Sequence, residues 1–144
     1  KQARRAALLH DIGQFVNAMD HHKHTQYLLL ANPLIGLDES HVAIVANVAR
    51  YHRKSLPKPQ HELYRALSPK QRVIVTKLAS FLRLADAMDN EHASKVLDFE
   101  VEYEKPNLVM RLKGEGDLYL ERWALVMKSS MLEEVFSVKF SVEE

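Results

Sequence analysis

The sequence has 144 residues, of which 47% are hydrophobic and 27% charged, with a formal net charge of +1 and no cysteine. These values describe an ordinary globular chain of about one domain, long enough to bury a sizeable core. The balanced charge gives no general support for binding nucleic acid or an anionic membrane, and the lack of cysteine excludes disulfides and thiolate metal sites. Because no apolar run approaches the ~18 residues of a membrane span and no signal peptide is visible, we expect a cytoplasmic protein.

Apolar spacing predicts that the first two thirds of the chain is helical. Residues 3–19 follow a helical rhythm, and a second, short helix is expected to end before Asn32-Pro33. Asp38 is a good N-cap for a helix over residues 39–53, whose apolar stripe ends at His52. Ser68-Pro69 should open a long helix reaching about residue 89 or 92, and its nearly all-round apolar surface predicts a central, buried helix.

The pattern changes after about residue 96. Apolar and polar residues alternate over 99–104 and again over 108–112, which predicts a hairpin with a turn at Lys105-Pro106-Asn107. An amphipathic helix is expected over 118–136 and a last strand over 138–142. The predicted fold is mainly α, with an all-helical bundle at residues 1–95 followed by a small α+β (ββαβ) subdomain at residues 96–144.

Histidines and carboxylates gather at helix ends and on apolar faces of the helical part. Imidazole and carboxylate ligands suit Mn, Fe, Ni, Zn or Co, or Mg where carboxylates dominate. One or two such ions would activate a water and clamp phosphoryl oxygens, and neighbouring cations could neutralise phosphate. The candidate ligands are His10, Asp11, the cluster His21, His22 and His24, then His52 and Asp86, and the candidate phosphate-binding residues are Arg50, Arg53 and Lys54.

Each of these residues also has a purely structural interpretation. His10-Asp11 could be a hydrogen-bonded pair at a helix end, and the histidine cluster a solvated loop. His52 could be a partner of a helix dipole, and Asp86 could pair with Arg83 one turn back. The basic cluster at 50–54 could be a solvated helix end. Gly13 costs helix stability and could permit close backbone approach beside His10 and Asp11. The negative end of the helix dipole disfavours the Asp86 carboxylate, so we expect a positively charged group beside it.

Four short segments together resemble a known family. Leu8-Leu9-His10-Asp11-Ile12-Gly13, followed by Asp86 in Leu84-Ala85-Asp86-Ala87, is similar to the HD-domain superfamily of metal-dependent phosphohydrolases. More narrowly, the HHKH segment at 21–24 and the RYHRK segment at 50–54 resemble the C-terminal region of the exopolyphosphatase / guanosine pentaphosphate phosphatase family. The resemblance covers most of residues 6–92.

The resemblance implies a set of site residues. His10, Asp11 and Asp86 match the HD metal ligands, with His10 and Asp11 also in the catalytic role. His24, with His22 as the fallback, and His52 match the histidines that extend the site in enzymes with two metals. HD enzymes take a first histidine from an upstream helix, and no histidine precedes His10 here. We therefore expect that helix either to precede this sequence or to contribute no ligand.

The resemblance implies a hydrolase acting on phosphoanhydride or phosphoester bonds, with a divalent metal ion as cofactor. The expected partners are polyphosphate or a phosphorylated nucleotide, without membrane or specific nucleic-acid binding. The alternative is a non-catalytic accessory module for polyphosphate binding and homodimerisation, because hydrolysis in that family is assigned to an N-terminal actin-like region. Nothing in this sequence resembles that region, and its four glycines form no phosphate loop.

Overall fold

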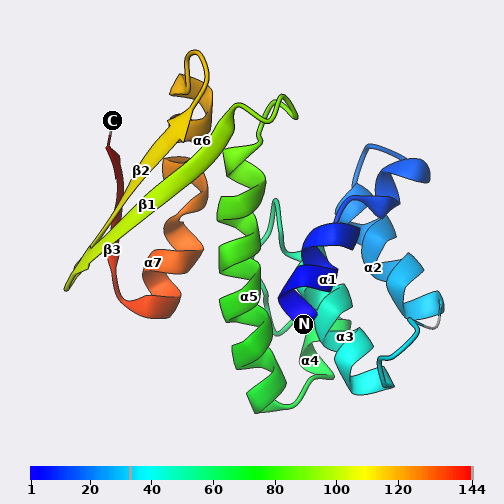
Figure 1. Ribbon diagram of the computed structural model, residues 1–144. Coiled ribbons are helices and arrows are strands. Elements are labelled where there is room, and N and C mark those ends of the chain that lie inside the picture. Colours follow the sequence, from blue (N-terminus) through cyan, green and yellow to red (C-terminus); the bar gives the residue numbers. More distant parts are fainter. Residues whose placement is uncertain (33, 144) are drawn as a thin grey trace. The chain divides into compact units, whose positions relative to one another are not determined.

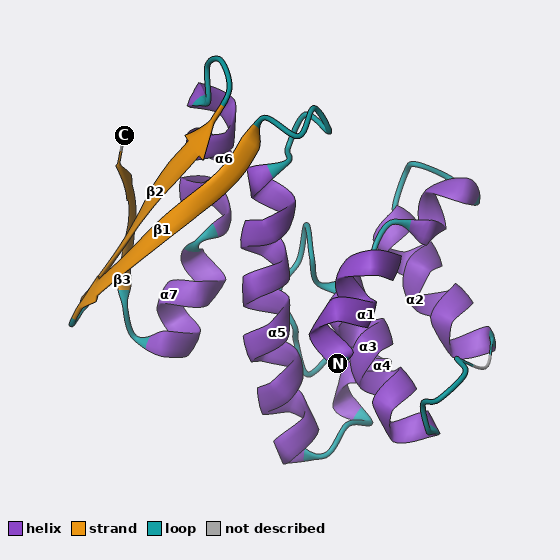
Figure 2. Cartoon of the chain, in the orientation of Figure 1, coloured by secondary structure: helices purple, strands orange, loops and turns teal. Residues whose placement is uncertain are grey.

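The computed structural model describes residues 1–32 and 34–143, and its contacts divide them into two compact units, residues 1–82 and residues 83–144 (Figure 1). The first unit is helical and the second combines helices with the sheet, as the colouring of Figure 2 makes plain. The prediction of a mainly α fold with a small C-terminal α+β part is confirmed. The boundary between the two compact units lies inside helix α5, whereas the sequence predicted a domain boundary after residue 95. The predicted domain limits, 1–95 and 96–144, stay a prediction. None of the described helices is long and apolar enough to cross a membrane.

The helical unit holds most of the predicted helices. It is built from α1 (Gln2–Leu9), the 3₁₀ turn η1 (Ile12–Phe15), α2 (His21–Ala31), α3 (Glu39–Arg50), α4 (Glu62–Arg65) and the greater part of α5 (Pro69–Met88). Helix α3 packs against both α1 and α2, and its residues 44–49 are all buried. In α5, by contrast, Val73 and Phe81 are about half exposed, at 54% and 52%. The continuous buried run therefore belongs to α3, and α5, which was predicted to be buried, is buried only in part, at Val75, Ala79 and Ala87 among others.

Two helix starts follow the predicted capping chemistry. The Asp38 carboxylate accepts a hydrogen bond of 2.8 Å from the backbone N–H of His41, which satisfies one of the donors that a helix start leaves unpaired. Ser68 and Gln71 form a reciprocal capping box at the start of α5. The short helix α4 was not predicted, since four residues are too few to show a periodic pattern.

The Asp38 cap should contribute to stability only while its carboxyl is ionised. The hydrogen bond from the His41 N–H lowers the pKa of Asp38 below its ordinary 3.8. A lowered carboxyl pKa adds stability above the unfolded-state pKa, and that contribution is lost as the pH falls from about 3.8 towards the folded-state value. Asp38→Asn keeps a capping oxygen but cannot titrate. We therefore expect the wild-type melting temperature to fall more steeply than that of the variant between about pH 5 and pH 3, in parallel thermal scans. Equal slopes would contradict this role.

The second unit is the predicted ββαβ arrangement with one helix divided. Strand β1 (Val96–Glu104) pairs antiparallel with β2 (Asn107–Gly114), and β3 (Lys139–Glu143) pairs parallel with β2. The helix predicted over 118–136 is two helices, α6 (Tyr119–Lys128) and α7 (Ser130–Phe136). Residues from the end of α5, the sheet, α6 and α7 share one core: Leu84, Ala87, Met110, Ala124, Leu125, Leu132 and Phe140. This core explains why α5 contributes to both units.

Candidate metal centre

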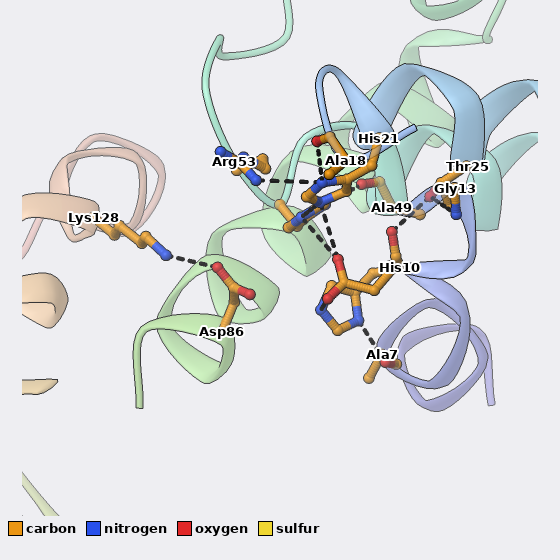
Figure 3. Close-up of polar contacts among 12 residues, drawn as sticks. Ala7, His10, Gly13, Ala18, His21, Thr25, Ala49, Arg53, Asp86 and Lys128 are labelled. Carbon is orange, nitrogen blue, oxygen red and sulfur yellow. Dashed lines mark hydrogen bonds and ion pairs between the residues drawn. The ribbon is translucent and has the colours of Figure 1, made fainter. Parts of the chain in front are cut away.

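Asp11 lies where side chains from three segments of the helical unit converge. Its Oδ1 is 3.0 Å from Nε2 of His21 at the start of α2, and 3.6 Å from Nε2 of His52 just after α3. Its Oδ2 is 3.6 Å from Nε2 of the neighbouring His10. His21 and His52 are almost fully buried, at 4% and 1% exposed, while His10 and Asp11 are partly open to solvent. The result is one carboxylate among three imidazoles. Figure 3 labels His10 and His21 of this group.

A break in the first predicted helix makes this convergence possible. The helical rhythm of residues 3–19 predicts one helix, but α1 ends at Leu9 and Asp11 takes a non-helical conformation, with φ −104° and ψ 1°. The backbone groups at the break bond to α2 instead: Gly13 N–H donates to Thr25 Oγ1 at 2.9 Å, and Thr25 Oγ1–H donates to the His10 carbonyl at 2.8 Å. The Thr25 hydroxyl thus satisfies both groups that leave the helix.

Gly13 allows this approach because it has no side chain. A Cβ placed there would lie 2.1 Å from the His21 carbonyl oxygen and 2.4 Å from the Thr25 nitrogen, both backbone atoms that cannot easily move. The expectation of a close backbone approach at Gly13 is confirmed. The contact brings the His10-Asp11 segment against the first turns of α2, and therefore beside His21.

Backbone carbonyls determine the orientation of two of the imidazoles. His10 Nδ1–H donates to the Ala7 carbonyl at 2.7 Å, and His52 Nδ1–H donates to the Ala49 carbonyl at 2.6 Å. Since a carbonyl can only accept, each neutral ring carries its lone pair on Nε2, the nitrogen that faces Asp11. Metal-binding histidines in proteins are usually held in this way, through the second ring nitrogen.

The donor set fits a divalent cation. Ligand atoms of His10, Asp11 and His52 all lie within 4.8 Å of one another. Asp11 Oδ1 is buried and, within the part of the chain that the structure describes, has no hydrogen bond of acceptable geometry although His21 Nε2 lies nearby. A buried carboxylate oxygen without a donor is costly, and a cation would satisfy it. His10, Asp11 and His52 are thus the residues placed to hold a metal ion, and His21 adjoins them, with its Nε2 3.0 Å from Asp11 Oδ1 and 3.2 Å from His52 Nε2.

The segment that precedes His52 is held by a separate hydrogen bond. The Tyr51 hydroxyl lies 2.8 Å from Nδ1 of His61, and the two rings stack at 5.5 Å. Tyr51 is buried, and burial raises its pKa to about 12, so its hydroxyl stays protonated at neutral pH. This contact ties the end of α3, next to His52, to the chain before α4.

The predicted ligands of the HHKH segment separate once α2 is formed. One interpretation made this segment a solvated loop, but α2 begins at His21, after Asp20 in a left-handed conformation. His21 therefore faces Asp11, with its Nε2 3.0 Å from Asp11 Oδ1. The compact group of possible ligands found among the described residues is His10, Asp11 and His52; it contains neither His22 nor His24, which is partly exposed, and His21 adjoins it only through its contact with Asp11. His22 is buried, and burial together with the charge of Arg50 lowers its pKa to about 4.

The predicted phosphate-binding residues have different surroundings. Lys54 pairs with Asp20 at 2.7 Å, and this contact, together with Lys23, holds the pKa of Asp20 well below its ordinary value. Arg53 Nη1 lies 3.3 Å from Nδ1 of His21. Arg50 has one buried guanidinium nitrogen, Nη1, with no hydrogen-bond partner among the described residues, and burial lowers its pKa.

Asp86 belongs to the second unit and forms an ion pair there. Lys128 Nζ of α6 donates to Asp86 Oδ2 at 2.6 Å, an interaction drawn in Figure 3. The positive group expected beside Asp86 is therefore present as a lysine. The assignment of Asp86 as a metal ligand stays a prediction.

His21 and Thr25 are the residues that sequence reasoning did not select. His21 was one of the candidate histidine cluster, but the resemblance to enzymes with two metals favoured His24, with His22 as the fallback. Nothing in the sequence around Thr25 indicates its role. It lies twelve residues after Gly13, and the hydrogen bond between them forms only because the fold brings the two segments together.

Comparison with known families gives an independent result. The family model described as Ppx/GppA phosphatase, domain III, matches residues 1–134 of the 144. The match includes the whole helical unit, with His10, Asp11, His21 and His52, and most of the second unit. The chain belongs to the Ppx/GppA phosphatase family and corresponds to its domain III.

Proposed function

We propose that this domain is a metal-dependent phosphohydrolase site acting on polyphosphate or phosphorylated guanosine nucleotides. The observation that carries the proposal is the convergence of three imidazole Nε2 atoms on the Asp11 carboxylate, within 3.0 to 3.6 Å. Four nitrogen and oxygen ligands on one side of a helical bundle are a typical arrangement for a divalent transition metal. When bound, such an ion supplies a Lewis acid that activates water and binds phosphoryl oxygens.

The chain's own residues would have separate roles. Asp11 provides the negative ligand, and His10, His21 and His52 provide neutral ones, two of them oriented by the Ala7 and Ala49 carbonyls. Arg50 and Arg53 lie at the end of α3 beside His52 and supply guanidinium donors for phosphate oxygens. A buried charged donor without an acceptor is costly, so Arg50 Nη1 is the donor with most to gain from a phosphate oxygen or a water.

One observation favours the alternative of a non-catalytic accessory module. The Asp86 carboxylate is paired with Lys128, which reduces its value as a ligand. A metal held by His10, Asp11, His21 and His52 alone could still organise phosphate binding without turnover. In this version the domain binds polyphosphate chains and supports dimerisation.

Phosphate release distinguishes the two versions. The 144-residue chain would be incubated with Mn²⁺, Zn²⁺ or Mg²⁺ and with polyphosphate or guanosine pentaphosphate, and orthophosphate would be measured. We expect release that requires metal and is lost in His52→Gln. His41→Gln is the matched control, since His41 is exposed and contacts Asp38 rather than Asp11. Metal retention without phosphate release would overturn the catalytic version and leave the accessory one, and a chain that retains no metal would contradict both.

A further inference from the structure

Nδ1 of His21 lies between two groups that require opposite protonation of the same atom. The Ala18 carbonyl oxygen is 3.2 Å away and can only accept a hydrogen bond. Arg53 Nη1 is 3.3 Å away and can only donate one. Figure 3 draws both contacts. A single neutral imidazole can satisfy one of these partners at a time, so the tautomer of His21 decides which contact is a hydrogen bond.

The other side of the ring indicates which partner is satisfied in the observed arrangement. His21 Nε2 lies 3.2 Å from His52 Nε2, and the 2.6 Å bond from His52 Nδ1–H to the Ala49 carbonyl leaves the lone pair on His52 Nε2. Two lone pairs would repel at this distance, and Asp11 Oδ1, 3.0 Å from the same nitrogen, can only accept, so the proton of the neutral ring lies on His21 Nε2, between these two acceptors. His21 Nδ1 then carries a lone pair and accepts from Arg53.

Cation binding requires the opposite tautomer. Nε2 of His21 has to present its lone pair to the ion, so a neutral ring carries its proton on Nδ1. The proton leaves Nε2 for solvent and another is taken up at Nδ1, with no net change in charge. Nδ1–H donates to Ala18, and Arg53 then faces a donor instead of an acceptor. The guanidinium, which is partly exposed, has to find another acceptor.

We propose that competition between Arg53 and the Ala18 carbonyl for His21 Nδ1 couples cation binding at Asp11 to oxyanion binding by Arg53. The inference rests on the proposed metal site and states how phosphate binding would regulate the affinity of that site for its cation. Without the cation, Arg53 donates to His21 Nδ1 and so stabilises the Nε2–H tautomer, which cannot bind the cation through Nε2. With the cation bound, Arg53 donates to a phosphate oxygen instead. By thermodynamic linkage each ligand raises the affinity for the other by the same factor. Arg53 is a positioning residue for His21 and a binding residue for phosphate.

The tautomer can be measured directly in the wild-type chain. Two-dimensional NMR of the histidine side-chain nitrogens, with His21 assigned from the signal lost in His21→Gln, reports which nitrogen is protonated. We expect Nε2–H before addition of Zn²⁺ and Nδ1–H after it. The same tautomer before and after Zn²⁺ would overturn the inference even if zinc binds, whereas a chain that binds no zinc would overturn the proposed function and this inference with it.

The coupling can be measured by calorimetry. Zn²⁺ would be titrated with and without sulfate, a tetrahedral anion that does not precipitate zinc. Loss of one hydrogen bond from a charged donor corresponds to about tenfold in an equilibrium constant. We therefore expect sulfate to raise wild-type zinc affinity by up to about tenfold, and Arg53→Met to bind zinc more tightly without sulfate and to lose the sulfate effect.

Lys23→Met is the matched control for charge. Lys23 is exposed on the first turn of α2 and pairs with Asp20, so its removal deletes a nearby positive charge without touching His21. We expect this variant to keep the sulfate effect. A sulfate effect that persists in Arg53→Met, or disappears equally in Lys23→Met, would show that general electrostatics rather than the His21 contact links the two ligands.

Discussion

Replacing His21 with glutamine is expected to weaken zinc binding by at least about 100-fold, while His24→Gln should bind as the wild type does. Substituting outer-shell partners of a metal already costs 10–100-fold, and a direct ligand should cost no less. His21 Nε2 lies 3.0 Å from Asp11 Oδ1, whereas His24 lies on the next turn of α2 and is partly exposed. Competition against a chromophoric zinc chelator measures both affinities.

The same titration distinguishes the two assignments of the HHKH segment. Circular dichroism would establish that each variant remains helical, so that loss of zinc is not loss of the fold. Asp11→Asn should resemble His21→Gln, because Asp11 is the proposed negative ligand and its carboxylate lies within 3.0 to 3.6 Å of three histidine Nε2 atoms. If His24→Gln lost zinc and His21→Gln kept it, the assignment made from the HHKH motif would be correct and the one made from the geometry wrong.

Replacing Gly13 with alanine is expected to destabilise the helical unit by about 3 kcal/mol and to abolish zinc binding. The new Cβ would lie 2.1 Å from the His21 carbonyl oxygen and 2.4 Å from the Thr25 nitrogen, so η1 and α2 would have to separate. Separation breaks both hydrogen bonds of the Thr25 hydroxyl and moves Asp11 away from His21. Thermal unfolding followed by circular dichroism, together with zinc titration, measures the two effects.

Gly116→Ala is a suitable comparison. Gly116 has a positive φ of 72°, but nothing lies within 4 Å of a Cβ placed there. Its substitution should cost about 1 kcal/mol from backbone strain and leave zinc affinity unchanged. Thr25→Val separates the hydrogen bonds from the steric effect, since valine has the same shape without the hydroxyl. A Gly13→Ala variant as stable as the wild type would show that η1 and α2 are not in tight contact.

Much of the secondary structure could be predicted because it depends on local chemistry. Asp38 caps α3, Ser68-Pro69 opens α5, and alternation over 99–112 becomes the β1–β2 hairpin. Each of these signals lies within a few residues of the element that it specifies. The family resemblance carried by four short segments agrees with the match to the Ppx/GppA phosphatase family over residues 1–134.

The helix breaks could not be predicted in the same way. Residues 3–19 and 118–136 both have continuous helical periodicity, yet each is divided in two. Periodicity reports which face of a segment is apolar, and two short helices packed on one core leave the same pattern as a single long one. At His10-Asp11 the chain leaves the helix because its backbone groups bond to Thr25, a residue of another element.

The sequence by itself determined the family, the mainly α architecture with its ββαβ end, and the residue types of the site, because motifs, caps and alternation are local. Only the tertiary structure decided which histidine of the HHKH segment meets Asp11. That choice depends on where α2 begins and on its rotation about its own axis, and one residue of helix turns a side chain by about 100°. The contact of Gly13 with the His21 and Thr25 backbone sets this rotation, and it directs His21 towards Asp11.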